Sequence, residues 1–262
     1  MRDGEGAVLP GHDQASHRVR CEWGPVGARA VAADYAVVVD VLSFTTTLTV
    51  ALEHGIEVFP FAWKDSRAAE HAVRHGATLA VGRFEALSRT DSRHVSLSPA
   101  SIAASEGIER LVLPSPNGST IAFDLAGAGV CVLGACLRNA DAVASWLVPR
   151  LAGGASVAVV PAGERWPDDS LRPAVEDLWG AGAVVAGLVD RGIDGLSPEA
   201  RVAETAFRAV RLRLPIELAG CASGVELVAA GFADDVEVAG ELDTSGVVPV
   251  LQGEAFVSAP CP

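Results

Sequence analysis

A run of β-branched residues constrains the fold of this chain more than any other stretch. From Val37 to Thr47 the sequence reads Val-Val-Val-Asp-Val-Leu-Ser-Phe-Thr-Thr-Thr. A continuous apolar run of this kind is typical of a strand that is buried on both faces. A helix is predicted from about Thr45 to His54, so Asp40 lies where the strand runs out. Ligands of open α/β sheets bind beyond the carboxyl ends of the strands, which makes Asp40 the first candidate site residue.

The three consecutive threonines need a compensating role, because each Thr in a helix costs up to about 0.7 kcal/mol relative to Ala. One interpretation is structural: Ser43 or Thr45 caps the helix, and the other hydroxyls bond to preceding carbonyls. The other is that one or two hydroxyls, such as those of Thr45 and Thr46, face an anion or a hydrated metal ion. The sequence leaves both interpretations open.

Strands and helices alternate through most of the chain. After the first strand and helix, the pattern predicts strands at 56–61, 78–81, 111–113, 130–133 and 157–160, with helices between them. This alternation favours an α/β fold, a mostly parallel sheet covered by helices on both faces. The last third predicts helices at 198–212 and 216–230, then terminal strands at 236–238 and 247–251.

The domain organisation follows from the same patterns. We expect a flexible N-terminal tail at 1–18 and a single α/β domain at 19–262, because no low-complexity linker divides the rest. The segment 82–106 is irregular, and we interpret it as a loop with a short helix near its end. Loops of that length inside a compact domain are commonly functional.

Charge and composition narrow the function classes. The formal net charge is −13 and no cluster of Lys and Arg occurs, which argues against nucleic-acid binding. An anionic substrate would need a local cation, either arginine or a divalent metal held by carboxylates. No apolar run reaches the roughly 18 residues needed to cross a bilayer, so no membrane partner is expected. The five cysteines form no C-x-x-C pair and favour reduced thiols, and we therefore expect a cytoplasmic protein.

Polar residues follow four of the predicted strands at the same edge of the sheet. A site assembled there would draw on Asp40, Asn117, Arg138 or Asn139, Glu164, and Glu176 or Asp177. Oxygen ligands of this kind select Mg²⁺ or Mn²⁺ over zinc. Because neighbouring helical positions lie about 100° apart, Glu176 and Asp177 cannot both point directly into one site.

Competing catalytic schemes find less support. An aspartyl phosphatase needs a second Asp two positions after the first, where this chain has Leu42. Neither G-x-S-x-G nor G-x-G-x-x-G follows a predicted strand. Cys136 is more typical of a packing cysteine than of a thiolate nucleophile. The pattern predicts His54, His71 and His75 on the solvent side of helices.

With these residues assembled, the chain resembles the 2-phosphosulfolactate phosphatase (ComB-like) family, the Mg²⁺-dependent phosphatases of coenzyme M biosynthesis. The resemblance covers most of 37–251. The motifs that carry it are Val38-Val39-Asp40-Val41-Leu42 with Thr45-Thr46-Thr47, Asn117-Gly118-Ser119, Leu137-Arg138-Asn139-Ala140, Glu176-Asp177 with Gly180-Ala181-Gly182-Ala183, and Gly231-Phe232 with Asp243 and Val247-Val248-Pro249.

The resemblance implies hydrolysis of a phosphate monoester on a small, strongly anionic carbon skeleton, with Mg²⁺ as cofactor. It implies Asp40, Asn117, Glu176 and Asp177 as catalytic residues, and Asp40, Glu176 and Asp177 as metal ligands. The expected ligand is a small phosphorylated acid, and a homodimer is a candidate assembly. The substrate-binding candidates are Thr45, Thr46, Arg83, Gly118, Ser119, Arg138 and Asn139.

The chain departs from the family pattern at four positions. The family usually carries Arg at the position of Ser43, Asn at that of Leu97, Glu near Arg83 and His near Ser223. An alternative function is therefore a catalytically inactive or regulatory module that binds a small anion on the same scaffold.

Overall fold

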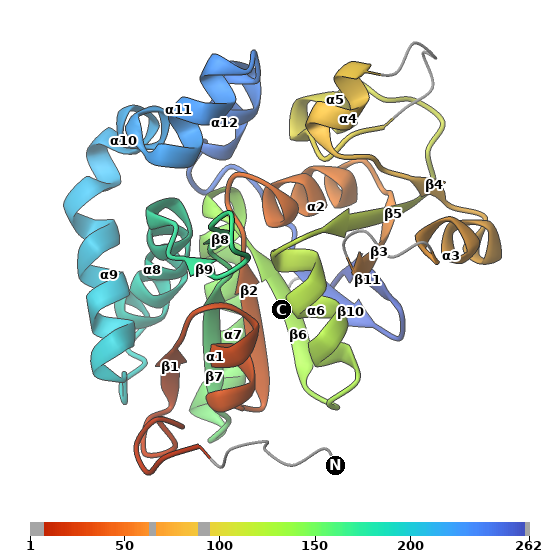
Figure 1. Ribbon diagram of the computed structural model, residues 1–262. Helices are drawn as coiled ribbons and strands as arrows, with labels where there is room; N and C mark the ends of the chain where they lie inside the picture. The colour runs from red at the N-terminus through yellow and green to blue at the C-terminus, as the bar shows by residue number, and fades with distance from the viewer. Residues whose placement is uncertain (1–7, 63–66, 89–94, 260–262) are drawn as a thin grey trace.

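The computed structural model describes residues 8–62, 67–88 and 95–259 (Figure 1). In this part of the chain, a nine-stranded sheet has helices on both faces. Its strands, in spatial order, are β1 (Val19–Cys21), β7 (Val157–Pro161), β2 (Tyr35–Val39), β6 (Cys131–Ala135), β10 (Pro249–Gln252), β11 (Ala255–Ser258), β3 (Glu57–Ala62), β5 (Arg110–Ser115) and β4 (Thr78–Leu79).

An antiparallel hairpin joins two parallel halves of this sheet. Strands β1, β7, β2 and β6 are parallel to one another, and so are β3, β5 and β4. The hairpin β10–β11 lies between the halves, with Val250 opposite Leu133 of β6 and Phe256 opposite Val58 of β3. The mostly parallel sheet predicted from the sequence is confirmed, with this antiparallel insertion at its centre.

The central strand β2 is buried on both faces, as the β-branched run predicts. Val37 and Val39 pack in one core with the helices α7 (Ala140–Ala152), α8 (Val175–Asp190) and α9 (Pro198–Val210). Ala36 and Val38 belong to the opposite core, which includes residues of α1 (Gly24–Ala30), α2 (Phe44–Glu53) and α6 (Gly118–Ala126). This division follows from the period of two in a strand.

The remaining elements are short. A separate two-stranded ribbon consists of β8 (Glu164–Arg165) and β9 (Leu171–Arg172). The other helices are α3 (Ala68–His75), α4 (Arg83–Ser88), α5 (Pro99–Ala103), η1 (Leu137–Asn139), η2 (Arg211–Arg213), α10 (Leu214–Gly220), α11 (Ala222–Ala229) and α12 (Ala233–Ala239). None of the helices in the described ranges is long and apolar enough to span a bilayer.

Two sequence predictions about the last third are wrong. The residues predicted as a strand at 236–238 lie in helix α12, where Val236 and Ala239 are buried three positions apart and Asp234 and Asp235 occupy the first turn. Acidic residues in the first turn favour the helix, and packing outweighs the β-branched alternation. The helix predicted at 216–230 is broken at Cys221, which ends α10 and begins α11.

Other boundaries depend on ranges that are only partly described. Within the predicted loop at 82–106 the structure has α4 and α5, whereas 89–94 lie outside the described residues. Within the predicted tail, 1–7 lie outside them, and Gln14 is buried and exchanges hydrogen bonds with the backbone of Cys21. The division into a tail at 1–18 and a domain at 19–262 stays a prediction.

Small residues on α8 allow close packing on two sides. A Cβ at Gly180 would lie 2.7 Å from a methyl group of Val39, and a Cβ at Gly182 would overlap the backbone carbonyl of Ala203 in α9. The sequence predicts this close approach. Because the neighbour of Gly182 is backbone, no side-chain rotation can make room there.

We therefore expect Gly182→Ala to lower the free energy of unfolding by about 2 kcal/mol, since overpacking outweighs the better helix propensity of Ala. Gly220→Ala is the matched control, because a Cβ there meets nothing within 4 Å. Urea unfolding of both variants measures the difference. Equal stability of the two variants would contradict the packing described.

Candidate active site

Asp40 lies at the carboxyl end of β2, between the N-termini of α2 and α6. Its side chain is buried, and Oδ2 accepts a hydrogen bond of 2.8 Å from the backbone N–H of Gly118. The backbone N–H of Phe44, the first residue of α2, also bonds the carboxylate, and Ser115 lies at hydrogen-bond distance. Helix N-termini favour negative charge, so the fold places this carboxylate where backbone dipoles stabilise it.

Gly118 is required for this approach. A Cβ at position 118 would lie 2.8 Å from Cβ and Oδ2 of Asp40 and 2.9 Å from the ring of Phe44. Because Cβ and Oδ2 belong to the buried, hydrogen-bonded side chain of Asp40, neither atom can move away easily. The sequence signal Asn117-Gly118-Ser119 therefore marks a close backbone contact with Asp40.

Asp177 fastens the start of α8 to the strand ends. Its Oδ1 accepts the N–H of Val41 at 2.7 Å, and its Oδ2 accepts the N–H of Gly163 at 2.9 Å. Its neighbour Glu176 is also buried, and Oε2 of Glu176 has no hydrogen-bond partner among the described residues. The two side chains thus have different roles: Asp177 ties backbone segments together, and Glu176 keeps one oxygen unsatisfied.

Glu164 is the fourth carboxylate of the group. It follows β7 on the short strand β8, and its Oε2 accepts a hydrogen bond of 2.9 Å from the side-chain amide of Asn117. Asn117, which follows β5, is thus linked to the site by its hydrogen bond to Glu164, which follows β7. The structure brings together residues that follow β2, β5 and β7, as the sequence predicts.

The electrostatics of these four groups are unfavourable without a cation. Burial raises the pKa of Asp40 to about 6, despite the N–H bonds that lower it. Burial, followed by the charge of Asp40, raises the pKa of Glu164 to about 7. The same two causes, with the charge of Glu176, raise the pKa of Asp177 well above its usual range. Each raised pKa means that these carboxyl groups resist ionisation, so a nearby cation would favour their charged forms.

Glu164 lines a cavity of about 280 Å³, whereas Asp40, Glu176 and Asp177 are buried and do not line it. Two of its arginines are held in place, because Nε of Arg83 lies 2.6 Å from Oδ2 of the buried Asp235, and Arg172 donates to Oγ of Ser223 at 3.0 Å. The positive charge of Arg83 partly offsets the rise in the pKa of Asp40, and that of Arg172 partly offsets the rise in the pKa of Glu164. The lining residues are Leu42, Ser43, Arg83, Pro116, Asn117, Glu164, Arg165, Arg172, Ser223, Glu226 and Leu227.

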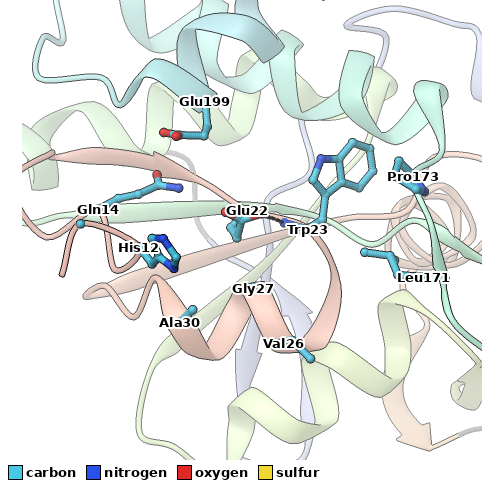
Figure 2. Close-up of a pocket in the computed structure, with 11 residues that line it drawn as sticks. His12, Gln14, Glu22, Trp23, Val26, Gly27, Ala30, Leu171, Pro173 and Glu199 are labelled. Atoms are coloured by element: carbon cyan, nitrogen blue, oxygen red, sulfur yellow. Dashed lines mark hydrogen bonds between the residues drawn. The ribbon is translucent and has the colours of Figure 1, made fainter. Parts of the chain in front are cut away.

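Two further cavities are lined in part by residues of α1. A second cavity of about 170 Å³ shares Asn117, Glu164 and Arg165 with the first. It in turn shares Trp23 and Leu171 with a larger one of about 530 Å³, shown in Figure 2. The three cavities are therefore neighbours, and Trp23 and Leu171 lie between the two that are nearer to α1.

Several predicted substrate-binding residues have structural contacts instead. The Thr45 hydroxyl donates to the carbonyl of Asp40 and that of Thr46 to the carbonyl of Val41, as the structural interpretation predicts, although the Ser43 side chain makes no cap. The Ser119 hydroxyl donates to the carbonyl of Leu113 at 2.7 Å. These side chains hold the strand-to-helix turns and do not line the cavity.

Arg138 and Asn139 lie away from the carboxylate group. Arg138 forms ion pairs with Glu53, at the far end of α2, and with Glu241. The Asn139 side chain bonds the backbone of Cys136 and Val247. The strand β6 borders the inserted hairpin, so these residues fasten the C-terminal segment and do not reach the cavity.

Arg172 and Asp235 are site residues that sequence reasoning missed. The only signal for Arg172 is its place just before Pro173 and the helix that carries Glu176. Asp235 precedes Val236, and the valines there predict a strand, so the sequence does not indicate that Asp235 lies on helix α12.

Cys136 is buried, and burial raises the pKa of its thiol, which agrees with a packing role.

The donor set fits a divalent cation with oxygen preference. Glu176 has a buried oxygen without a hydrogen-bond partner among the described residues, and the pKa values of Asp40 and Asp177 are raised. A bound cation would satisfy that oxygen and stabilise the ionised carboxylates. In the described chain, the ligand atoms of Asp40, Glu176 and Asp177 do not all lie within 4.8 Å of one another. Mg²⁺ keeps several waters and binds through one or two carboxylates, so it does not need all three side chains in direct contact with the ion.

Comparison with known proteins supplies the family context. A family model described as 2-phosphosulpholactate phosphatase matches residues 27–254. A protein named "Probable 2-phosphosulfolactate phosphatase" from Parasynechococcus marenigrum is 31% identical over 235 residues, covering 86% of this chain and 92% of that protein. The "2-phosphosulfolactate phosphatase" of Methanothermobacter thermautotrophicus is 32% identical over 218 residues, covering 82% and 86%. The resemblance predicted from the motifs is confirmed, and the alternative of an inactive module is not favoured.

The raised pKa values predict how stability depends on pH. Asp40 and Glu164 bind protons more tightly in the folded than in the unfolded chain, so their stabilising effect is complete below about pH 4 and is lost as the pH rises through about 6 to 7. In EDTA we expect the free energy of unfolding to fall between pH 5 and pH 8, by about 1.4 kcal/mol for Asp40, because about one pH unit of this range lies below its pKa in the folded chain.

Urea unfolding at pH 5, 6, 7 and 8 measures this slope. Asp40→Asn should flatten it, and Mg²⁺ should restore stability more at pH 8 than at pH 5, because the ion binds ionised carboxylates. A free energy of unfolding that rises steadily over this range in EDTA would contradict the assignment.

Proposed function

The chain belongs to the 2-phosphosulfolactate phosphatase family, and from this premise we propose that it hydrolyses a phosphate monoester on a small, strongly anionic carbon skeleton with the aid of Mg²⁺. One observation carries the proposal: the buried carboxylates Asp40, Glu176 and Asp177 are grouped with Glu164, and Glu164 lines a cavity together with three arginines. Acidic groups beside anion-binding groups suit a cation and a phosphate ester together.

The carboxylate group would hold the cation. We assign Asp40, Glu176 and Asp177 as ligands, and Glu176 has a buried oxygen without a hydrogen-bond partner among the described residues. When bound, Mg²⁺ neutralises phosphate charge and makes a nearby water more acidic. Asp177 keeps the start of α8 in register with the strand ends, through its two bonds to backbone N–H groups.

The cavity wall would hold the substrate. The guanidinium groups of Arg83 and Arg172 offer paired donors to phosphate or carboxylate oxygens. The fixed partners Asp235 and Ser223 limit the motion of these side chains. This pre-organisation lowers the entropy lost when an anion binds.

Glu164 is our candidate for proton transfer. It lines the cavity, and its pKa of about 7 lies near neutral pH, where a general acid or base is most effective. The Asn117 amide holds one of its oxygens at 2.9 Å, which fixes the orientation of the carboxylate. In this assignment Glu164 takes a proton from the attacking water or gives one to the leaving alcohol.

The substrate skeleton would contact residues that depart from the family pattern. Ser43, Arg83 and Ser223 all line the cavity, whereas Leu97 is a buried core residue. The first substrate to test is 2-phosphosulfolactate, followed by other small phosphorylated acids. A role in coenzyme M biosynthesis, a cytoplasmic location and a homodimer stay predictions. The free thiols of the four described cysteines support the cytoplasmic location.

The first prediction concerns Asp40. In the presence of Mg²⁺, Asp40→Asn should lower kcat/KM for phosphate release by about a hundredfold or more, because it removes a negative charge from the proposed metal site. Asp124→Asn is the control, since Asp124 is an exposed residue of α6. A phosphate-release assay with wild type and both variants is decisive: activity of Asp40→Asn equal to wild type would overturn the site.

The second prediction concerns the cavity wall. Arg172→Gln should raise KM about tenfold or more with little change in kcat, because it removes charge-assisted hydrogen bonds to the bound anion. Arg208→Gln, a surface variant on α9 whose arginine bonds Asp190 and Glu204, should leave both constants unchanged. An unchanged KM for Arg172→Gln would show that the substrate does not bind in this cavity.

A further inference from the structure

Three metal-ligating side chains converge on the face of the sheet that α3 covers. Each of His71, His75 and Glu254 offers one ligand atom, and these atoms all lie within 4.8 Å of one another. In the described part of the chain this is the one set of His, Cys, Asp or Glu side chains with that property. The two histidines are four positions apart on α3, so they project from the same face of the helix.

The burial of His71 corrects the sequence prediction of a solvent-side residue. His71 is only 5% exposed, and its ring packs 4.8 Å from that of Phe61 between centroids. Its Nε2 is buried and has no hydrogen-bond partner among the described residues. A buried polar nitrogen without a partner costs free energy, so a ligand for this atom would relieve a penalty.

The second histidine already approaches the carboxylate. Nε2 of His75 lies 3.2 Å from Oε2 of Glu254, and the rings of His71 and His75 are 4.5 Å apart between centroids. Adjacent ligand atoms around a tetrahedral zinc ion are roughly 3.3 Å apart, given bonds of about 2.0–2.1 Å. One edge of such a tetrahedron is therefore in place, and a small rotation of His71 would complete a face.

From this geometry we propose that His71, His75 and Glu254 form a second metal site, which binds a divalent transition-metal ion, with zinc the best match. Two imidazole nitrogens and one carboxylate oxygen are ligands that zinc accepts and Mg²⁺ does not prefer. Burial, followed by the charge of His75, lowers the pKa of His71, which keeps its imidazole in the neutral form that binds metals.

The surroundings allow an ion to enter and one further ligand to bind. A cavity of about 330 Å³ is lined by both His71 and Glu254, together with Pro60, Phe123 and Leu251. Glu254 is 63% exposed, so the site faces solvent on one side. Three protein ligands beside an open cavity leave room for a fourth position occupied by water.

The site would connect elements that are far apart in the sequence. Glu254 lies in the turn of the hairpin β10–β11, and the histidines lie on α3, which is beside β3 in Figure 1. The rings of His75 and His71 contact those of Phe59 and Phe61 of β3. An ion held here fastens the inserted hairpin to the second parallel half of the sheet. It contacts none of the residues that line the carboxylate-bearing cavity, so its role is independent of the proposed hydrolysis.

Calorimetric titration of the full-length protein with zinc chloride tests the proposal. The protein is stripped with EDTA, freed of chelator and kept in excess Mg²⁺ so that the carboxylate group is occupied. We expect one zinc ion per chain and a higher Tm with zinc. His71→Gln and Glu254→Gln should each weaken zinc binding at least tenfold and abolish the rise in Tm. Because Glu254 is largely exposed, its variant tests the site without disturbing the core.

Two controls separate this site from others. His54→Gln changes an exposed histidine at the end of α2, and Asp40→Asn changes the carboxylate group, so both should bind zinc within about twofold of wild type. The proposal fails if wild type binds no zinc, if His71→Gln and Glu254→Gln bind it as tightly as wild type, or if Asp40→Asn alone removes the binding.

Discussion

The hydrogen bond from the backbone of Gly118 to the carboxylate of Asp40 joins the two parallel halves of the sheet at the active-site edge. Asp40 follows β2 in one half, and Gly118 begins the helix that follows β5 in the other. A buried carboxylate needs such donors, and a charge-assisted hydrogen bond contributes about 1.5–3 kcal/mol. The absence of a side chain at Gly118 permits the contact, which adds a link at the active-site edge between the two halves that the hairpin β10–β11 joins.

The same edge concentrates negative charge that the protein alone does not neutralise. The charges of neighbouring carboxylates disfavour the ionised forms of Glu164 and Asp177, although Asp177 accepts hydrogen bonds from two backbone N–H groups. A folded state that tolerates this repulsion is less stable than it could be. Sites that bind cations or transfer protons commonly lower the stability of the folded state in this way, because their function requires like charges to lie close together.

Sequence reasoning predicted features that depend on local pattern and missed those that depend on distant partners. The β-branched run identified β2, and the residues after β2, β5 and β7 were predicted to meet. Arg138 and Asn139 were assigned to the site because they also follow a strand, but β6 borders the hairpin, whose position the sequence does not signal. His71 was predicted to face solvent because nothing in α3 reveals that Phe59 and Phe61 cover that face.

The place of the hairpin in the sheet has a consequence for biosynthesis. Strands β10 and β11 come last along the chain but stand in the middle of the sheet, between β6 and β3. While the ribosome is still translating residues before 249, β6 and β3 are therefore unpaired edge strands of the two parallel halves. Unpaired strand borders recruit other chains and promote aggregation. The nascent polypeptide thus stays vulnerable until residues 249–258 have emerged, and chaperone protection would matter most before that point.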